Sequence, residues 1–218
     1  MEPDTALDIA RGLAAQNVTV EVTPAERVAS TTVRHSYPAT PVGRGIRLDV
    51  GDLYAREPRL VLMEFRLEEV SPGQEVEVGS IRVQGHVLTR GGGVETRCID
   101  LPVRLRVGEG PLVDPEVRRV ASLLDAADAR KEAIRLREEG DREHASHVLC
   151  EAAETLALEG ADDEEVAREA TILREAALRM ESGVWGVAEQ KYAKQEAHDL
   201  GRSRALARER YQRDPERS

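Results

Sequence analysis

The stretch Arg59-Leu-Val-Leu-Met-Glu-Phe-Arg-Leu67 decides the predicted fold. Its apolar residues run without a polar break from Leu60 to Met63 and continue at Phe65 and Leu67. A short apolar run of this kind is typical of a strand that is buried on both sides, although Leu, Met, Glu and Arg also suit a helix. The neighbouring segments alternate with period two and favour the strand. We therefore predict a β-sandwich centred on residues 59–67.

Alternating apolar and polar residues predict further strands on both sides of this run. Val18, Val20 and Val22, for example, share one face of a strand that Pro24 closes. Pro102 predicts that the last strand lies at an edge, because proline cannot donate a hydrogen bond to a central ladder. The further predicted strands cover residues 17–23, 27–36, 46–50, 75–89 and 94–107, with a loop at 37–45. About six antiparallel strands joined by short turns favour a sandwich.

A helical half follows the strands and begins where Asp114 precedes Pro115. A carboxylate at the N-cap with proline at the first helical position is a typical helix start. Apolar residues at the spacing of one helix face then recur between Gly and Asp boundaries. The predicted helices cover about 115–139, the stretch between Gly140 and Gly160, the stretch from Asp162 or Asp163 to about 180, and about 184–200.

The predicted fold class is therefore α+β, with an antiparallel β-sandwich followed by a C-terminal α-helical (helical hairpin) domain. The predicted divisions are an N-terminal helix at 1–16, the β-sandwich domain at 17–110, the helical domain at 114–201 and a flexible basic tail at 202–218. The N-terminal helix is too short to be stable alone in water, so it must pack on another part of a protein.

Composition excludes several classes of function. The 218 residues carry a net charge of -10 and only 3% aromatic residues, which argues against a nucleic-acid surface. The two cysteines, Cys98 and Cys150, fall in different predicted domains, so we expect a reduced, cytoplasmic chain. No signal segment and no apolar run near 18 residues occurs, so no membrane contact is expected. All three lysines fall in the second half of the chain.

Six short stretches, taken in order, carry a resemblance to a known family. They are Leu13-Ala-Ala-Gln-Asn-Val-Thr-Val-Glu-Val22, Tyr37-Pro38, Gly51-Asp-Leu-Tyr-Ala-Arg-Glu-Pro-Arg59, Asp114-Pro-Glu-Val-Arg118, Gly140-Asp141, and Lys191 followed by Gly201-Arg-Ser-Arg204. Together they resemble the region that follows the von Willebrand factor type A (VWA) domain in bacterial, chiefly actinobacterial, proteins. The resemblance implies a sandwich and helical tail that accompany a VWA domain, without that domain itself.

The metal site of that family has the core Asp-x-Ser-x-Ser, and this string does not occur here. The best metal-like cluster in the sequence is His144, His147 and Cys150. His144 and His147 share a helix face, whereas Cys150 lies about 120° around the helix from His144. Three groups so arranged do not converge on one tetrahedral zinc ion. We interpret them as two surface imidazoles and a buried thiol, and we expect no metal and no cofactor.

The function that these observations favour is a non-catalytic scaffold or protein-interaction module that accompanies a VWA-type domain in cis or in trans. Its helices would present the partner-binding surface. The candidate partner-binding residues are Trp185, Tyr192, Lys191, Arg202 and Arg204. A lone Trp in a helical half is, however, more often part of the core.

Two alternatives remain open. One is a hydrolase-like enzyme with a site at the sandwich–helix junction, built from His35, His86, Asp100 and Glu109. The other is a metal-bridged adhesion module that supplies an acidic ligand in trans to a metal ion held by a partner.

Overall fold

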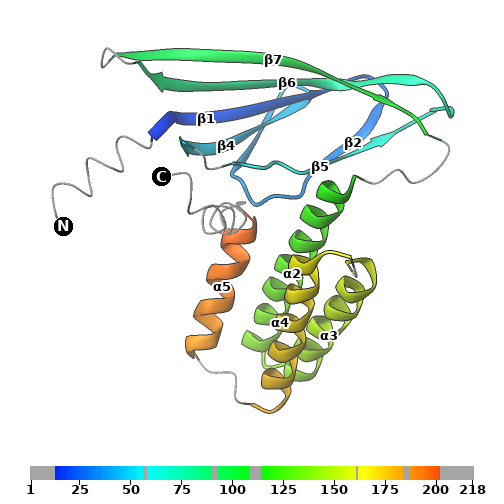
Figure 1. Cartoon of the computed structure of the whole chain (residues 1–218), viewed down its shortest axis with the longest axis vertical. Helices are drawn as coiled ribbons and strands as arrows, with labels where there is room; N and C mark the ends of the chain where they lie inside the picture. The colour runs from blue at the N-terminus through cyan, green and yellow to red at the C-terminus, as the bar shows by residue number, and fades with distance from the viewer. Residues whose placement is uncertain are drawn as a thin grey trace.

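The computed structural model describes residues 13–55, 58–89, 93–108, 114–160, 162–183 and 187–201. In these residues the strands all precede the helices along the chain, and they lie at opposite ends of the molecule (Figure 1). The strands are β1 (Leu13–Pro24), β2 (Val28–Val33), β3 (Ala39–Val42), β4 (Gly45–Tyr54), β5 (Met63–Leu67), β6 (Glu75–Leu88) and β7 (Val94–Arg106). The helices are α2 (Pro115–Glu138), α3 (Arg142–Glu159), α4 (Glu164–Glu181) and α5 (Val187–Gly201).

The strands form a five-stranded sheet in the order β3-β4-β1-β6-β7 and a two-stranded sheet of β2 and β5. Every strand pair among the described residues is antiparallel. The mixed α and β class and the antiparallel pairing are therefore confirmed, whereas the packing as a sandwich with helical hairpins stays a prediction. β7 is the edge strand that Pro102 predicts. The Val107 N–H donates to the Gln74 carbonyl, and the Val107 carbonyl accepts from the Gly73 N–H, so the backbone of Val107 faces the segment that leads into β6. Backbone groups of successive residues point to opposite sides of a strand, so Pro102, five residues earlier, directs its ring nitrogen away from β6.

The apolar run at 59–67 is not a strand buried on both sides, and this prediction is wrong. Only Met63–Leu67 forms a strand, and its residues alternate between half-buried and exposed. Leu60 and Leu62 lie before the strand and pack against Leu123 and Leu124 of α2 and their neighbour Val120. The run is apolar because Leu60 and Leu62 lie at the contact between the strands and α2. Periodicity within the strands does not reveal such a contact.

Two further predictions need correction. The helix predicted over 1–16 is wrong for Leu13–Gln16, which open β1, and residues 1–12 lie outside the described part of the chain. Leu13 pairs with Tyr54, and this ladder overrides the helix propensity of a Leu-Ala-Ala sequence. The loop predicted at 37–45 contains β3, which turns back onto β4 through Gly43 at a φ of 57°.

The helical half follows its predicted boundaries closely. Asp114 caps α2 by accepting from the Glu116 N–H at 2.8 Å, and Asp141 and Asp163 cap α3 and α4 in the same way. The helices enclose one continuous core built mainly from alanine and leucine, including Leu149, which is 1% exposed. Small alanine side chains let the helices approach closely, which compensates for the scarcity of aromatic residues.

Polar contacts join the strand half to the helical half. Arg34, which follows β2, donates to Glu64 at 2.6 Å and also to Asp125 of α2. The Ser36 N–H donates to the Gly201 carbonyl at the end of α5 at 2.8 Å. Together with the apolar contacts of Leu60 and Leu62, these bonds hold the segments after β2 and before β5 against the helices.

Candidate functional site

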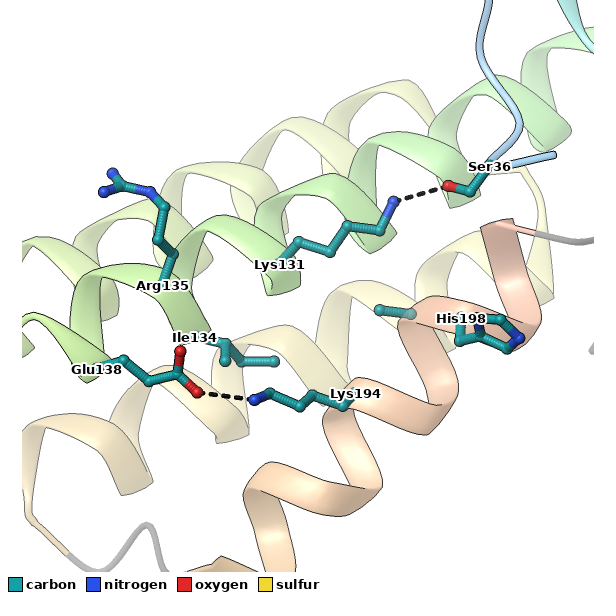
Figure 2. A pocket seen from close by; sticks show the side chains of 8 residues that line it. Ser36, Lys131, Ile134, Arg135, Glu138, Lys194 and His198 are labelled. Carbon is teal, nitrogen blue, oxygen red and sulfur yellow. Dashed lines mark hydrogen bonds and ion pairs between the residues drawn. The ribbon is translucent and has the colours of Figure 1, made fainter. Parts of the chain in front are cut away.

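A cleft of 310 Å³ lies between α2 and α5, where both helices meet the segment after β2 (Figure 2). Its lining residues are Ser36, Lys131, Ile134, Arg135, Glu138, Lys194, Ala197 and His198. Helical periodicity places them together, because positions three and four apart share a face. Lys131, Arg135 and Glu138 therefore line the α2 side, while Lys194 and His198 line the α5 side. We refer to this site as the α2–α5 cleft.

Two hydrogen-bonded contacts occupy opposite ends of the cleft, and Figure 2 shows both. At one end the Lys194 Nζ donates to Glu138 Oε1 at 2.7 Å and bridges the two helices. This hydrogen bond is the main reason why the pKa of Glu138 lies below its ordinary value. At the other end the Lys131 Nζ donates to Ser36 Oγ at 3.1 Å and to Asp128 at 2.9 Å. A hydrogen-bonded lysine thus lies at each end of the cleft.

Arg135 contributes charge to the cleft but directs its guanidinium away from Lys194 (Figure 2). Its Nε and Nη2 donate to Glu132 at 2.8 and 2.5 Å, and its Nη1 donates to Glu139 at 2.5 Å. These bonds, first of all the one to Glu132, raise the pKa of Arg135 above its ordinary value. Lys131, Lys194 and His198 are therefore the cationic or ionisable groups best placed to meet an anion in the cleft.

A buried histidine, His35, lies beside this junction. The Leu62 N–H donates to its Nδ1 at 2.8 Å, and its ring stacks on Tyr37 with 5.8 Å between the centroids. Burial, and secondarily the positive charge of Arg34, lowers the pKa of His35 to about 4. The ring is therefore neutral near pH 7, and its Nδ1 serves as an acceptor that fixes the segment before β5.

The residues of the hydrolase alternative lie on different elements. His86 Nδ1 lies 3.1 Å from Thr96 Oγ1 in the β6–β7 hairpin, and Asp100 accepts from Arg82 in the same hairpin at 2.6 Å. His35, by contrast, follows β2 and accepts from the Leu62 N–H, and Glu109 falls outside the described residues. No contact among these residues is apparent where the structure describes them, and the enzyme hypothesis stays a prediction.

The metal candidates lie on α3 with separate partners. His144 contacts Asp141 at 2.5 Å, which raises the pKa of His144, and His147 lies 3.3 Å from Glu151. Cys150 is half-buried and packs against the helical core. Within the described ranges, no group of three His, Cys, Asp or Glu side chains is arranged to hold a metal ion. The metal-bridged alternative stays a prediction.

The partner-binding candidates from the sequence lie mostly beyond what the structure describes. Trp185, Arg202 and Arg204 fall outside the described residues, and Tyr192 is described only as backbone within α5. Lys191 is exposed on α5 and does not line the cleft. None of the four described helices is both long and apolar enough to cross a membrane.

Sequence reasoning missed the residues that line the α2–α5 cleft. The available signal was the scarcity of lysine, because two of the three lysines in the chain, Lys131 and Lys194, line this one cleft. A second signal was the spacing of Lys131, Arg135 and Glu138, which forms a charged stripe on one face of α2. The sequence does not show that this stripe faces α5 rather than open solvent.

Comparison with known proteins adds one structural likeness. No family model matches the sequence, and no curated protein matches it. Among solved structures, the chain is similar to "von Willebrand factor type A from Catenulispora acidiphila", with 18% sequence identity and a TM-score of 0.46. The match covers 75% of this chain and 42% of that protein, so this chain spans less than half of its length.

This finding corrects the resemblance inferred from the sequence. The prediction treats the chain as a region that follows a VWA domain and lacks the domain itself. That prediction is wrong, because the likeness that covers 75% of the chain is to a protein that is itself described as von Willebrand factor type A.

Proposed function

We propose that this chain is a non-catalytic protein-interaction module whose α2–α5 cleft receives an acidic segment of a partner protein. One observation carries the proposal. Lys131, Arg135, Lys194 and His198 line a single cleft whose lining includes one carboxylate, Glu138, in a chain whose net charge is -10. A cleft with low-dielectric walls and a local excess of positive charge concentrates the electrostatic field and attracts anions.

The lysines of the cleft have hydrogen-bonding capacity for such a ligand. An ammonium group has three N–H donors. Among the described residues, Lys194 donates to Glu138, and Lys131 donates to Ser36 and Asp128. Each lysine can therefore donate to one further carboxylate without giving up these bonds, and charge-assisted bonds of this kind are about twice as strong as neutral ones.

The apolar residues in the cleft favour a peptide over a small inorganic anion. Ile134 and Ala197 lie between the charged groups, and they can contact the aliphatic stem of a Glu side chain or a neighbouring apolar residue. In this proposal the two sheets pack as a β-sandwich that braces the helices. The contacts of Arg34 and Ser36 at the junction support that role, because they fix the segment that lines one end of the cleft.

Selection from a random peptide library tests the proposal while the partner is still unidentified. Twelve-residue peptides displayed on phage are selected on the full chain and counter-selected on the double variant Lys131→Glu with Lys194→Glu. We expect the enriched peptides to carry at least two acidic residues and to bind the full chain with a Kd of about 1–100 μM, about 5–8 kcal/mol of binding free energy. The double variant should bind them at least tenfold more weakly.

Lys191→Glu is the matched control for Lys194→Glu, because it makes the same charge change on the same helix, α5, at an exposed position outside the cleft. It should leave the affinity within about twofold once the measurement is made at 0.15 M salt, where distant charges are screened. Enriched peptides without acidic residues, or equal binding to the full chain and the double variant, would rule out the cleft as the site.

A further inference from the structure

A second cleft, of 410 Å³, is lined entirely by residues of the strand half. Its lining residues are Val22, Pro24, Val28, Ala29, Ser30, Thr31, Pro41, Arg44, Gly45 and Ile46. They come from β1 and β4 of the larger sheet, from β2 of the smaller sheet, and from β3 and the turn that follows it. Most of them are apolar, and the volume falls within the range of about 300–1,000 Å³ that is usual for small-molecule sites. We call this site the inter-sheet cleft.

One polar atom of the inter-sheet cleft is buried without a partner. The Thr31 Oγ1 is shielded from solvent, and among the described residues it has no hydrogen-bond partner. Thr31 lies on β2, directly opposite Phe65 in the ladder with β5. Leaving a buried hydroxyl unpaired is unfavourable, and this hydroxyl can donate one hydrogen bond and accept two. Thr31 lines the cleft, and a rotation of its side chain would present this hydroxyl to a polar group that enters there.

The inter-sheet cleft also carries a cation, Arg44. This residue follows Gly43 in the turn between β3 and β4, and its side chain is exposed. Where the structure describes the chain, Arg44 makes no ion pair, whereas Arg47 on the adjoining β4 pairs with Glu21 at 2.9 Å. A guanidinium matches the planar geometry of a carboxylate and can bind it through two parallel hydrogen bonds.

We propose that the inter-sheet cleft binds a carboxylate carried on a short branched aliphatic chain. Arg44 pairs with the carboxylate, Thr31 donates a hydrogen bond to it, and the aliphatic part packs against the apolar walls formed by Val22, Val28 and Ile46. This chemistry is offered by a free short-chain acid and by the C-terminal Val or Leu of a peptide. The site shares no residue with the α2–α5 cleft, and the inference does not rest on the function proposed for it.

Titration with 3-methylbutanoate, followed by two-dimensional NMR of the full ¹⁵N-labelled chain, tests the charge requirement. We expect saturable shifts centred on Thr31, Arg44 and Ile46, with a Kd of about 1–10 mM, since so small a ligand has few atoms to contribute. The uncharged 3-methylbutanamide has nearly the same shape and should bind at least tenfold more weakly. Equal binding of acid and amide, or shifts elsewhere in the chain, would overturn the proposal.

A peptide arm distinguishes the two sources of the carboxylate. Acetyl-Ala-Ala-Val with a free C-terminus is compared with the same peptide ending in an amide. Tighter binding of the free-acid peptide than of 3-methylbutanoate identifies a C-terminus as the ligand. Binding of 3-methylbutanoate alone identifies a free acid. If neither the peptide nor the acid binds, the proposal fails.

Two variants and a control assign the binding to the named residues. Arg44→Gln should weaken binding of the preferred carboxylate at least tenfold, while Arg47→Gln, which removes a paired arginine nearby, should leave it within twofold. Thr31→Val removes the hydroxyl at nearly constant shape, so it should weaken binding about threefold to tenfold without lowering the Tm of the free chain. Full affinity in Arg44→Gln would show that Arg44 does not bind the carboxylate. A clear drop in Tm for Thr31→Val would show that the hydroxyl stabilises the free chain instead.

Discussion

The helical half and the strand half of this molecule bury their apolar residues in different ways. The helices enclose one continuous cluster, all of whose members come from α2 to α5. The strands bury far fewer residues, among them Val22 and Leu48. Four of the seven large apolar side chains that are exposed in the described residues lie on one strand, β7: Val94, Ile99, Leu101 and Leu105. From this difference we infer that the helices are stable alone, whereas the strands depend on the junction with the helices.

The largest effect is expected from the buried ion pair in the helical half. Arg130 of α2 donates to Glu169 of α4, and the two side chains are 4% and 11% exposed. Arg130→Met leaves a buried carboxylate without this partner and should reduce the free energy of unfolding by about 3–5 kcal/mol. Urea unfolding measures the loss.

Hydrogen exchange of the same variant shows whether the halves are coupled. If the strands depend on the helices, protection should fall in both halves. The double variant Arg130→Met with Glu169→Leu removes both charges and should recover most of the stability. Protection that falls in the helices alone would show that the strands are stable without intact helices.

The next effect concerns the apolar junction itself. Leu124 is 3% exposed and belongs to the α2 cluster on which Leu60 and Leu62 pack. Leu124→Ala should cost about 2–4 kcal/mol through lost burial and the cavity left behind. Because the cavity lies at the junction, exchange should increase more in the strands than in the helical core.

Leu158→Ala is the matched control for this variant. It makes the same chemical change at a position of α3 that is 82% exposed, so it should alter stability by less than about 0.5 kcal/mol. If Leu124→Ala increases exchange in the helices but not in the strands, the strands do not draw their stability from this junction.

Each half also contains a histidine with a shifted pKa, and the two shifts have opposite directions. The pKa of His35 is lowered to about 4, from an ordinary value of 6.5, mainly by burial, and the pKa of His144 is raised by its contact with Asp141. Because unfolded His35 binds a proton below pH 6.5 while folded His35 does not, its contribution is complete above pH 6.5 and is lost as the pH falls to 4. With partial solvent screening, we expect a loss of about 1–2 kcal/mol over this range.

Urea unfolding between about pH 4 and pH 7 measures this dependence. His35→Gln should flatten it, since the group that titrates is removed. His144→Gln should leave the acid loss in place, because a histidine with a raised pKa adds stability at low pH and loses it as the pH rises. An unchanged pH profile in His35→Gln would show that another group controls the acid sensitivity.

The sequence predicted most of what depends on local chemistry. The caps at Asp114 and Gly140-Asp141 and the long β6–β7 hairpin follow from turn residues and periodicity, which act within a few positions. The strand at 39–42 pairs with its neighbour β4, but the two prolines and two glycines in 37–45 predict a loop there. The division of residues 59–67 depends on α2, a partner far along the chain, so local patterns misplace it. The α2–α5 cleft could not be predicted for the same reason, since Glu138 and Lys194 meet only after α5 returns along α2.

The smallest effect we predict lies within the helical half alone. Asp163 accepts hydrogen bonds from the N–H groups of Glu165 and Val166, at 3.0 and 3.1 Å, and so caps α4. Asp163→Ala leaves these donors unpaired and should cost about 1 kcal/mol, measured by urea unfolding. The exposed neighbour Asp162 offers a matched control, because Asp162→Ala removes the same charge without removing the cap. An equal cost for both variants would attribute the effect to charge near the helix N-terminus.

Because the cap acts on the first turn of α4 and not at the junction, hydrogen exchange in the strands of Asp163→Ala should not change. A simultaneous increase in β1 or β6 would show that even the far end of the helical bundle supports the sheets, and the contrast between the two halves would then be one of degree.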